Sequence, residues 1–550
     1  MYVRIHKQKQ RGKVYASLQL CESYRDPAKG NAPRSRVLLN LGPIEKLSAE
    51  TLHALAKGFA RAAGEPVGGE VISPTLLAAR DFGHIHAVGS VWDNLGLSEA
   101  LVEAGVNGET SFDPAAMIRL LVINRLCEPC SKWALLDWLA GVHWDGEKPS
   151  YHHLLRAMDR LIEAKEKAEP LVAKRLLRKD EPLDLVFYDM TSTYFEGDRS
   201  LAEGDVRCFG YSRDHRKDRR QVVIGMVMTR EGIPLCHHVF AGNTVDKSTV
   251  TGVVQDLKSR FDLSRMVFVG DRGMLSDANL ETLLDEKLGF IVAHPLRRNQ
   301  QARDVIGPLA KQFDRHGEGE QFFEEQREGV RFVVAFSPSM AKEVAEVRKK
   351  RLAKADDWIK ERLAKLAAPG CKGRRPTPQG TYDRIRDYLR DHGLLGFYEE
   401  TLVDGNISIQ KDRQVLAWEN KIDGILMVET TDRTLPAEEI IRRYKELAEI
   451  ERGWRSLKST LLLRPVYHWT EERIRAHVFI CVLALQVERW MRRKLVPAGL
   501  SVPKCLDSLQ RIKVAEVEIQ GKTRRMLTRP IEEQKQILEA LGVPLAPADI

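Results

Sequence analysis

The first 45 residues alternate between apolar and polar positions, which is the pattern of strands with one solvent-exposed side. The alternating segments are YVRI, KVYASLQL and RSRVLLNL, and turn-forming residues around Pro27 separate them. Residues 48–64 change to a helical spacing, and the Gly- and Pro-rich stretch GEPVGGEVISP follows as a linker. The pattern predicts a small β-rich unit with one helix over residues 1–70.

Apolar residues then recur at helical spacing from about Val91 to Arg178, as in AAMIRLLVINRL and WALLDWLAGV. This spacing predicts a helical domain over residues 75–180. Two helices with a short break between Pro114 and Ala140 fit either a DNA-binding helix-turn-helix or an ordinary packed helix pair, and the sequence alone does not separate the two.

Short, almost purely apolar runs begin at Leu183 and indicate a different class of structure. LDLVFYDM and RMVFVGDRG have almost no polar residue before their Asp, as in strands that are buried on both faces of a sheet. A hairpin with its turn at Arg230 to Pro234 and a helix lie between them, and a helix and the strand FIVAHPL follow. The order β-β-β-α-β-α-β predicts an α/β fold with an antiparallel meander beside parallel strands, which is the order of a ribonuclease-H-like fold.

The pattern is interrupted after residue 300. Strand-like segments and a basic helical stretch precede a long helix from Ala437 to about Leu463 and an apolar helix from Glu471 to Leu495. We therefore expect an α/β core with a mixed β/α insertion, preceded by the β-rich unit and the helical domain. The predicted boundaries are 181–300 and 422–495 for the core, 301–421 for the insertion and 496–550 for a C-terminal tail.

Charge is unevenly distributed along the chain. Lys and Arg total 86 against 77 Asp and Glu, which gives a net charge of +9. The excess lies in residues 1–70, 207–220 and 348–376, and the rest of the chain is net acidic. A single basic stretch is often a solvated helix face, but three together favour a polyanionic partner, and we expect nucleic acid.

The same composition argues against other classes of protein. The longest apolar run, Val478 to Leu485, is far shorter than the roughly 20 residues of a membrane-spanning helix, and the N-terminal residues lack the apolar stretch of a signal peptide. Eight mostly isolated cysteines do not make a disulfide framework, and Cys127 and Cys130 form a lone Cys-x-x-Cys without a second ligand pair for zinc. We expect a cytoplasmic, nucleoid-associated protein with no membrane partner.

Two carboxylates follow the buried strands: Asp189 closes LVFYD, and Asp271 closes MVFVGD. A carboxylate at the end of an apolar strand is costly unless a cation or hydrogen bonds compensate it. Two such strands in one sheet would bring both side chains to the same edge, where oxygen ligands suit Mg²⁺ or Mn²⁺ better than zinc. Alternatively, each Asp caps the turn that follows its strand.

Glu451 lies in the predicted long helix, with Tyr444 seven residues before it and Lys458 seven residues after it. Seven residues return an α-helix to within about 20° of its starting direction, so the three residues share one stripe, which adjoins an apolar stripe. The stripe would be long enough to follow several phosphates of a DNA strand. The alternative is a solvated face on which glutamates form ion pairs with Lys or Arg four residues away.

In these positions the chain resembles bacterial insertion-sequence DDE transposases, whose last catalytic helix carries the signature Tyr-x2-Arg-x3-Glu-x6-Lys. Tyr444, Glu451 and Lys458 match this register, whereas Leu447 stands at the Arg position, as it does in one branch of the superfamily. The segments YDMTSTYFEG, GNTVDKST, VGDRGMLS, DGILMVET and RPVYHWTEERIRAHVFICVLAL also resemble that branch. The resemblance is strong over residues 183–490 and loose before them.

The resemblance implies a ribonuclease-H-like core in which Asp189, Asp271 and Glu451 hold two Mg²⁺ ions, with Mn²⁺ as a substitute. It implies an enzyme that binds terminal inverted repeats, through the helical domain, and cleaves and joins DNA by two-metal phosphoryl transfer. Its partners would be double-stranded DNA, as transposon ends and target, and a second copy of the chain in a synaptic homodimer. The residues expected to contact DNA are Tyr444, Lys458, Arg455, Arg216, Lys217, Arg219, Arg220, Lys349, Lys350 and Arg351.

Two other functions stay open from the sequence. One is a metal-dependent nuclease of the same fold without strand transfer, and the other is an inactive, transposase-derived DNA-binding protein, against which the three acids argue. Relatives use the insertion to assist a DNA hairpin intermediate, in which an aromatic residue stacks on a displaced base. Trp358 and Trp418 are the tryptophans of the insertion, and neither lies in a recognisable motif.

Overall fold

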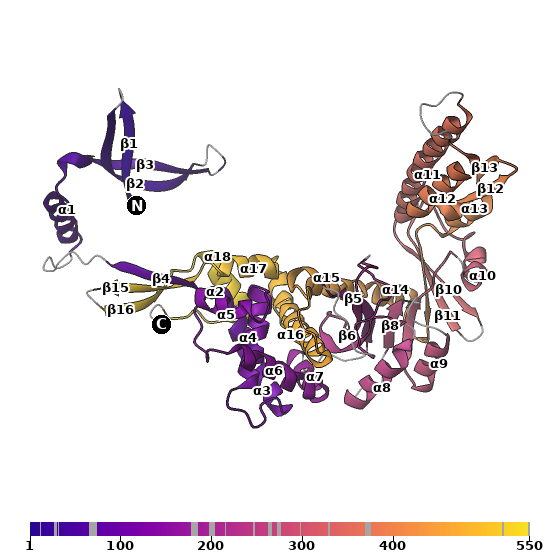
Figure 1. Ribbon diagram of the computed structural model, residues 1–550, viewed down its shortest axis with the longest axis horizontal. Helices are drawn as coiled ribbons and strands as arrows, with labels where there is room; N and C mark the ends of the chain where they lie inside the picture. The colour runs from indigo at the N-terminus through magenta and orange to yellow at the C-terminus, as the bar shows by residue number, and fades with distance from the viewer. Residues whose placement is uncertain are drawn as a thin grey trace. The chain divides into compact units, whose positions relative to one another are not determined.

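The computed structural model of the chain is drawn in Figure 1. It describes residues 1–550 except 11–12, 27–29, 31, 65–73, 178–184, 197–203, 215, 246–247, 262–266, 272–276, 298, 328–329, 369–375, 520–521 and 548–550, and the side chains of residues 10, 13, 271 and 277. The chain forms two compact units, of which one contains residues 1–79 and 515–526 and the other residues 80–514 and 527–548.

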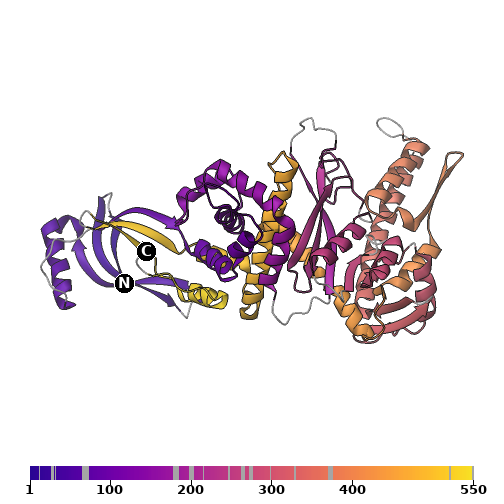
Figure 2. The ribbon, with the colours of Figure 1, turned by 90° about the horizontal axis from the view of Figure 1, so that it is seen from below.

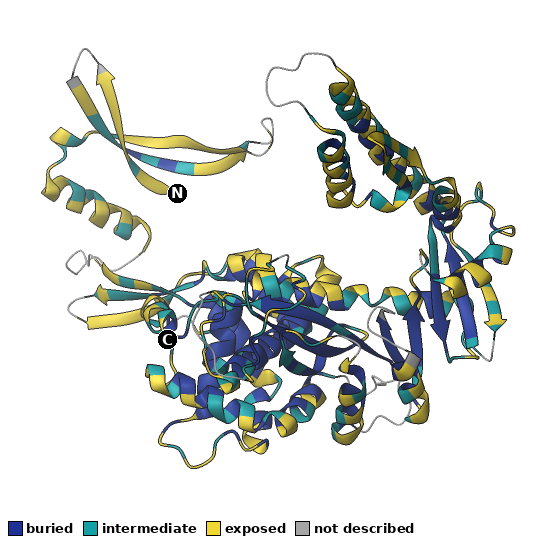
Figure 3. Cartoon of the chain, turned by 45° about the vertical axis from the view of Figure 1, so that its right-hand side comes forward, coloured by how far each residue is buried: buried dark blue, intermediate teal, exposed yellow. Residues whose placement is uncertain are grey.

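The first unit begins with the predicted β-structure. Strands β1 (Tyr2–Gln10), β2 (Lys13–Asp26) and β3 (Ala32–Pro43) form an antiparallel sheet in the order β1-β2-β3. Helix α1 (Ala49–Ala62) follows, and the Ser48 hydroxyl caps it by accepting a hydrogen bond from the Thr51 amide. Most residues of β3 are exposed (Figure 3), so this sheet lacks the buried faces of the larger one described below.

A second small sheet joins distant parts of the chain, and the sequence did not predict it. Strand β4 (Thr75–Asp81) pairs with the hairpin of β15 (Lys513–Ile519) and β16 (Lys522–Leu527) in the order β16-β15-β4. Residues 515–526 therefore belong to the first unit, whereas the rest of the predicted C-terminal tail belongs mainly to the second. Most of the predicted linker before β4 lies outside the described residues.

The helical part of the second unit confirms the helical pattern predicted between residues 91 and 178. Its helices are α2 (Gly83–Asn94), α3 (Leu97–Glu103), α4 (Pro114–Cys127), α5 (Ala134–Gly141), α6 (Tyr151–Glu163) and α7 (Lys165–Leu176). Three more helices come from the C-terminal part of the chain, namely α16 (Glu471–Leu495), α17 (Val502–Leu509) and α18 (Glu532–Leu541). Helix α16 packs against α4, α6 and strand β7 and so joins the helices to the main sheet (Figure 2).

The main sheet has eight strands in the order β10-β11-β14-β9-β8-β5-β6-β7. Strands β5, β6 and β7 form an antiparallel meander, and β8 and β9 continue from β5 in parallel. Strands β14, β11 and β10 then extend the sheet in antiparallel fashion. The bounds are β5 (Leu185–Tyr194), β6 (Gln221–Thr229), β7 (Pro234–Ala241), β8 (Val267–Asp271), β9 (Gly289–Ala293), β10 (Gln321–Arg327), β11 (Val330–Phe336) and β14 (Ile425–Thr430).

Helices cover both faces of this sheet, which confirms the predicted α/β class. Helices α8 (Val250–Arg260) and α9 (Asp277–Asp285) lie on one face, and α14 (Ala437–Lys445) and α15 (Ala448–Arg455) lie on the other (Figure 1). Val186 and Tyr188 of β5 pack in the cluster that contains α8 and α9, whereas Leu185 and Phe187 pack in the cluster that contains α15 and α16. Odd-numbered positions of β5 therefore face α15.

The predicted insertion consists of sheet strands and a separate arm. Helix α10 (Gln300–Leu309), β10 and β11 pack in one apolar cluster with β14. The arm then leaves the sheet after β11 and returns before β14, and its first and second helices have a small apolar core of their own. Its elements are α11 (Pro338–Ala367), α12 (Pro378–Asp391), β12 (Tyr398–Val403), β13 (Asn406–Lys411) and α13 (Arg413–Ile422).

The length and polarity of the helices decide whether any of them could span a membrane. Among the described residues, no helix combines the length and the apolar character that crossing a membrane requires. The long apolar helix α16 is buried, and the eight residues from Val478 to Leu485 are each at most 1% exposed within the second unit.

Candidate active site

Asp189 lies in the middle of a strand, not at its end. We expected it to close the strand LVFYD, but β5 continues to Tyr194 and pairs with β6 along this whole second half. The residues after Asp189 are MTSTY, and Thr and Tyr favour strands. A prediction that follows only the apolar run ends the strand too early, because most of these residues are polar. Asp189 is half-buried and faces α15, as its odd position requires.

Both carboxylate oxygens of Asp189 accept hydrogen bonds. Oδ1 accepts from the Met190 amide at 2.7 Å, and Oδ2 accepts from the Trp454 indole Nε1 at 3.1 Å. Burial raises the pKa of Asp189 to about 6, and the nearby Glu451 carboxylate also raises it, whereas the two hydrogen bonds and the Arg213 charge act in the opposite direction. The carboxylate is thus incompletely compensated, and a cation would compete with a proton for it below about pH 6.

The backbone of β8 places position 271 level with position 189. The parallel register pairs Leu185 with Val267 and Phe187 with Val269. The same offset, carried two residues further, aligns positions 189 and 271, because neighbouring parallel strands advance together. Position 271 ends β8 as predicted, opposite Ala293 of β9. The Asp271 side chain lies outside the described part of the chain.

The helix that carries Glu451 is not uniform, which corrects our expectation of one straight stripe from residue 444 to residue 458. Helix α14 ends at Lys445, α15 begins at Ala448, and the residues from Ser456 to Thr460 form a π-helical turn. Between α14 and α15 the backbone makes a tighter turn, in which the Leu447 amide donates to the carbonyl of Tyr444, three residues before it, at 3.0 Å. Tight and wide turns change the angle per residue, so spacing alone does not align the three side chains.

Glu451 is the exposed acid of this segment, and it differs from its neighbours. Glu446 pairs with Arg230 at 2.6 Å and with Arg442 at 3.0 Å. Glu449 pairs with Arg492 of α16 at 2.8 Å. Within the described residues, Glu451 has neither an ion pair nor a hydrogen bond through its carboxylate. The ion-pairing alternative therefore accounts for Glu446 and Glu449 but leaves the Glu451 carboxylate available.

An ion pair that the sequence did not predict holds Lys458 beside the sheet. Its Nζ is 3.0 Å from Asp214 Oδ1, and Arg464 Nη1 is 2.6 Å from Asp214 Oδ2. The Arg464 guanidinium also lies 5.0 Å from the centre of the Tyr194 ring at the end of β5. Asp214 belongs to the predicted basic segment 207–220, and its mainly buried carboxylate holds two cations next to the strand of Asp189.

Two parts of the chain match known protein families. Residues 184–487 match the transposase DDE domain, and residues 3–71 match the N-terminal domain of IS1634 family transposases. The chain belongs to the insertion-sequence DDE transposases. The resemblance stated from the sequence is thus confirmed, and the second match extends it to the N-terminal residues. No curated protein matches the chain.

Several basic residues of the transposase that we predicted to contact DNA have internal partners. Arg216 makes a two-pronged contact with Asp218 at 2.9 and 3.0 Å, and Arg219 lies 3.3 Å from Glu196. Arg220 stacks on Phe209 at 5.4 Å, whereas Lys217 is exposed. Any role of these residues in DNA binding stays a prediction.

The basic helix α11 is divided in the same way. Lys349 and Lys350 are exposed, and Arg351 donates to the His392 carbonyl. Arg348 is buried and binds Asp423, so it stabilises the base of the arm rather than adding to a basic surface. Near Glu451, Arg455 is exposed, whereas Tyr444 is half-buried.

The remaining predicted features are mostly structural. Trp418 is 7% exposed and donates to the Leu296 carbonyl at 3.0 Å, and Trp358 stacks on Tyr388 at 4.0 Å. Cys130 lies 3.3 Å from Asn124, and within the described residues no third ligand joins Cys127 and Cys130. Neither tryptophan is exposed for stacking on DNA in this conformation.

One group of possible metal ligands does occur among the described residues. Cys236, His238 and Asp256 have ligand atoms within 4.8 Å of one another. Arg260 binds the Asp256 carboxylate, and burial raises the pKa of the Cys236 thiol. A guanidinium beside a protonated thiol disfavours a cation, so this group is a partly buried polar cluster that joins β7 to α8.

Proposed function

We propose that the chain binds the inverted repeats at the ends of an insertion sequence and catalyses DNA cleavage and strand transfer through Asp189, Asp271 and Glu451. The observation that carries the proposal is the hydrogen bond of 3.1 Å from Trp454 Nε1 to Asp189 Oδ2. Trp454 lies one helical turn from Glu451, so this bond ties the helix of one acid to the strand of the other.

The residues fit a pair of divalent cations. Asp189 combines a raised pKa with carboxylate oxygens that each accept one hydrogen bond and retain a free lone pair. Glu451 is exposed, and its carboxylate has no other partner among the described residues. Asp189, Asp271 and Glu451 would hold Mg²⁺, or Mn²⁺ in its place, as hard oxygen ligands. Bound there, such ions stabilise the attacking and leaving oxygens of an in-line phosphoryl transfer.

The strand order supports a ribonuclease-H-like core. The five strands β7-β6-β5-β8-β9 consist of an antiparallel meander whose first strand, β5, is central and pairs in parallel with β8. Asp189 occupies this central strand, and position 271 ends its parallel neighbour. The level register of the two positions supports a joint role for their carboxylates.

The chain's own residues would position the DNA. We propose that Lys458, Arg455 and Tyr444 contact phosphates beside the acids, with further contacts from Arg216, Lys217, Arg219 and Arg220 and from Lys349, Lys350 and Arg351. The partners of Arg216, Arg219 and Lys349 are exposed carboxylates, so phosphates could replace them. The helices of residues 75–180 would bind the transposon ends, and two copies of the chain would pair two ends.

Asp214→Asn is expected to strengthen binding of end-containing DNA by about five- to tenfold at low salt. In the free protein, Asp214 neutralises both Lys458 and Arg464, and its loss would free two cations for phosphate. A filter-binding or anisotropy titration over a series of salt concentrations measures the effect. Asp387→Asn is the matched control, because Asp387 is exposed and pairs with Arg390, which is not among the proposed DNA contacts, and it should leave the affinity unchanged. Weaker binding by Asp214→Asn would show that Asp214 only holds the loop in place.

The function itself is tested with purified protein, Mg²⁺ and DNA that carries the ends of the element. We expect joined products, in which a transposon end is covalently attached to target DNA. Nicked or cut DNA without joining would favour the nuclease alternative, and intact DNA at full end binding would favour the inactive DNA-binding protein. Inverted repeats in the DNA just outside the reading frame are a further expectation of the transposase.

A further inference from the structure

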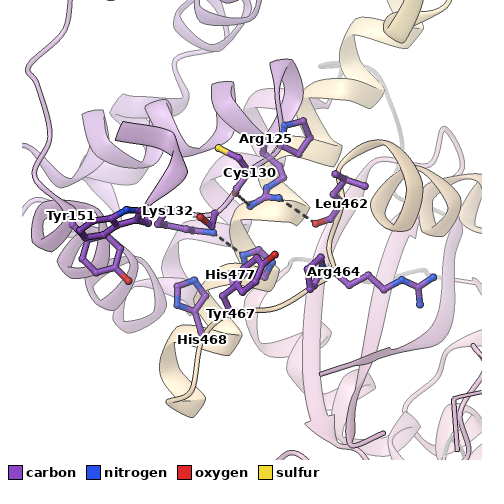
Figure 4. A pocket seen from close by; sticks show the side chains of 13 residues that line it. Arg125, Cys130, Lys132, Tyr151, Leu462, Arg464, Tyr467, His468 and His477 are labelled. Carbon is purple, nitrogen blue, oxygen red and sulfur yellow. Dashed lines mark hydrogen bonds between the residues drawn. The ribbon is translucent and has the colours of Figure 1, made fainter. Parts of the chain in front are cut away.

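A cavity of about 470 Å³ lies in the second unit, between the loop after α4 and the segment that leads into α16 (Figure 4). Its wall contains Arg125, Lys132, His468 and His477, together with the aromatic side chains of Trp133 and Tyr467. No Asp or Glu is among the described residues that line it. The volume falls within the range of small-molecule binding sites.

Two cations are buried at this cavity without a carboxylate partner among the described residues. Lys132 is 5% exposed, and its Nζ lies 2.8 Å from His477 Nδ1. Arg125 is also 5% exposed and donates to the Leu462 carbonyl at 3.2 Å and to the Cys130 carbonyl at 3.2 Å. Neutral acceptors satisfy the hydrogen bonds but leave the charge uncompensated, which is costly in a protein interior.

The pKa values of Lys132 and His468 reflect the same excess of uncompensated positive charge. Burial is the main cause that lowers the pKa of Lys132 to about 7, and the Arg125 charge contributes in the same direction. Burial and the charges of Lys132, Arg473 and Arg125 lower the pKa of His468 to about 3. An anion in the cavity would reverse these effects, because it would stabilise each charged form.

Exposed aromatic rings stand at the rim of the cavity. Trp133 is 67% exposed and Tyr467 is 63% exposed, which is unusual for side chains of this size. Trp133 and Tyr151 form a T-shaped pair with ring centres 5.4 Å apart, so the largely exposed Trp133 ring has a fixed neighbour on one side. Cations beside exposed aromatic rings are the combination that binds nucleotides, with phosphate on the cations and the base on a ring.

The cavity is also connected to the proposed active site. Leu462 has a φ of 42°, a conformation that residues other than glycine seldom adopt, and Arg125 holds its carbonyl. Two residues later, the Arg464 side chain runs away from the cavity (Figure 4) and reaches Asp214, the partner of Lys458. The segment from Lys458 to His468 therefore passes from the proposed DNA contacts directly to the cavity wall.

We propose that this cavity binds one nucleotide of the DNA strand, with its phosphate against Lys132 and Arg125 and its base against Trp133 or Tyr467. The inference rests on the proposed function, because the nucleotide would belong to the DNA that the enzyme binds. It adds a site that lies between the helical part and the catalytic core. Binding would place an anion where the protein has two buried cations, so the site would also strengthen the contact between α4 and the segment before α16.

The test uses the full-length protein with two probes, thymidine 5′-monophosphate and inorganic phosphate, measured by calorimetric titration and thermal melting. We expect both probes to bind and to raise the melting temperature, with the nucleotide about tenfold tighter because its base stacks. Lys132→Met should weaken both probes about tenfold or more and should remain folded, since it removes a buried charge that has no counterion. The double variant Trp133→Leu/Tyr467→Leu removes both rings on which the base could stack and should weaken binding of the nucleotide alone.

Lys504→Met is the matched control, because Lys504 is exposed on α17 and does not line the cavity. It should bind both probes as the wild type does. Wild-type protein that binds neither probe at millimolar concentration, or Lys132→Met protein that binds both unchanged, would overturn the inference. Wild-type protein that joins DNA but binds neither probe refutes this site alone, whereas nucleotide binding without any DNA cleavage refutes the proposed function alone.

Discussion

Asp189→Asn is expected to abolish metal-dependent DNA cleavage, with a loss of about a thousandfold or more. The substitution removes the negative charge that would hold a cation but keeps the shape of the side chain, and several kcal/mol of transition-state stabilisation correspond to such a loss. Cleavage of end-containing DNA with Mg²⁺ measures the rate, and a titration without metal measures end binding. We expect end binding within about threefold of the wild type, because phosphate contacts supply most of such affinity.

The stability of the Asp189→Asn protein provides its control. An amide can accept a hydrogen bond from either the Met190 amide or the Trp454 indole but not from both, so one of two bonds is lost. Removal of an incompletely compensated buried charge acts in the opposite direction, and we expect a net change of no more than about 1–2 kcal/mol. Lost end binding together with a much lower melting temperature would mean that Asp189 is structural.

Glu451→Gln and Glu449→Gln are expected to have opposite effects although they lie two residues apart on one helix. Glu451→Gln should lower cleavage about a thousandfold and leave stability within about 0.5 kcal/mol, because the side chain is exposed and its carboxylate has no partner among the described residues. Glu449→Gln should leave cleavage within a few-fold but lower stability by about 1–3 kcal/mol, because Glu449 binds Arg492 and the buried Arg489. Cleavage rates and urea unfolding curves measure the two effects.

This pair separates catalysis from folding within a single element. If Glu451→Gln protein cleaved DNA at the wild-type rate, Glu451 would be one more solvated residue and the proposed three-acid site would lack a member. If both variants lost activity in proportion to their stability, the helix would act only as a support for the sheet. Proteins with confirmed wild-type circular dichroism spectra are needed for the comparison.

The sequence predicted the main sheet well because its strands are buried on both faces. Continuous apolar runs such as LVFYD and MVFVGD are hard to mistake for surface strands, and their order along the chain matches the element order in the structure. The same pattern misplaced the end of β5. We placed the end of the strand at Asp189, where the apolar run stops, whereas the hydrogen-bonded strand continues five residues further to Tyr194.

Other parts of the site depend on contacts that leave no local pattern. Asp214 lies in a basic segment and was counted as part of its charge, yet its pairing with Lys458 joins residues 244 positions apart in the chain. Trp454 has the spacing of a core residue and is one, and its hydrogen bond to Asp189 follows only from the packing of α15 on β5. Pairing of β4 with β15 is equally non-local, and short strands with exposed residues give a weak signal.

The way in which the arm joins the sheet has a consequence for how such chains can change length. Phe336, the last residue of β11, pairs with Ile425, the first residue of β14, and the Ser337 amide donates to the Gly424 carbonyl at 2.9 Å. The arm thus departs and re-enters at directly opposed points, as a loop enlarged between the two strands of a β-hairpin does. Exchange of the whole excursion for a tight turn would leave the register of all eight strands intact, so insertions or deletions here can accumulate between relatives without disturbing the positions that hold the acids.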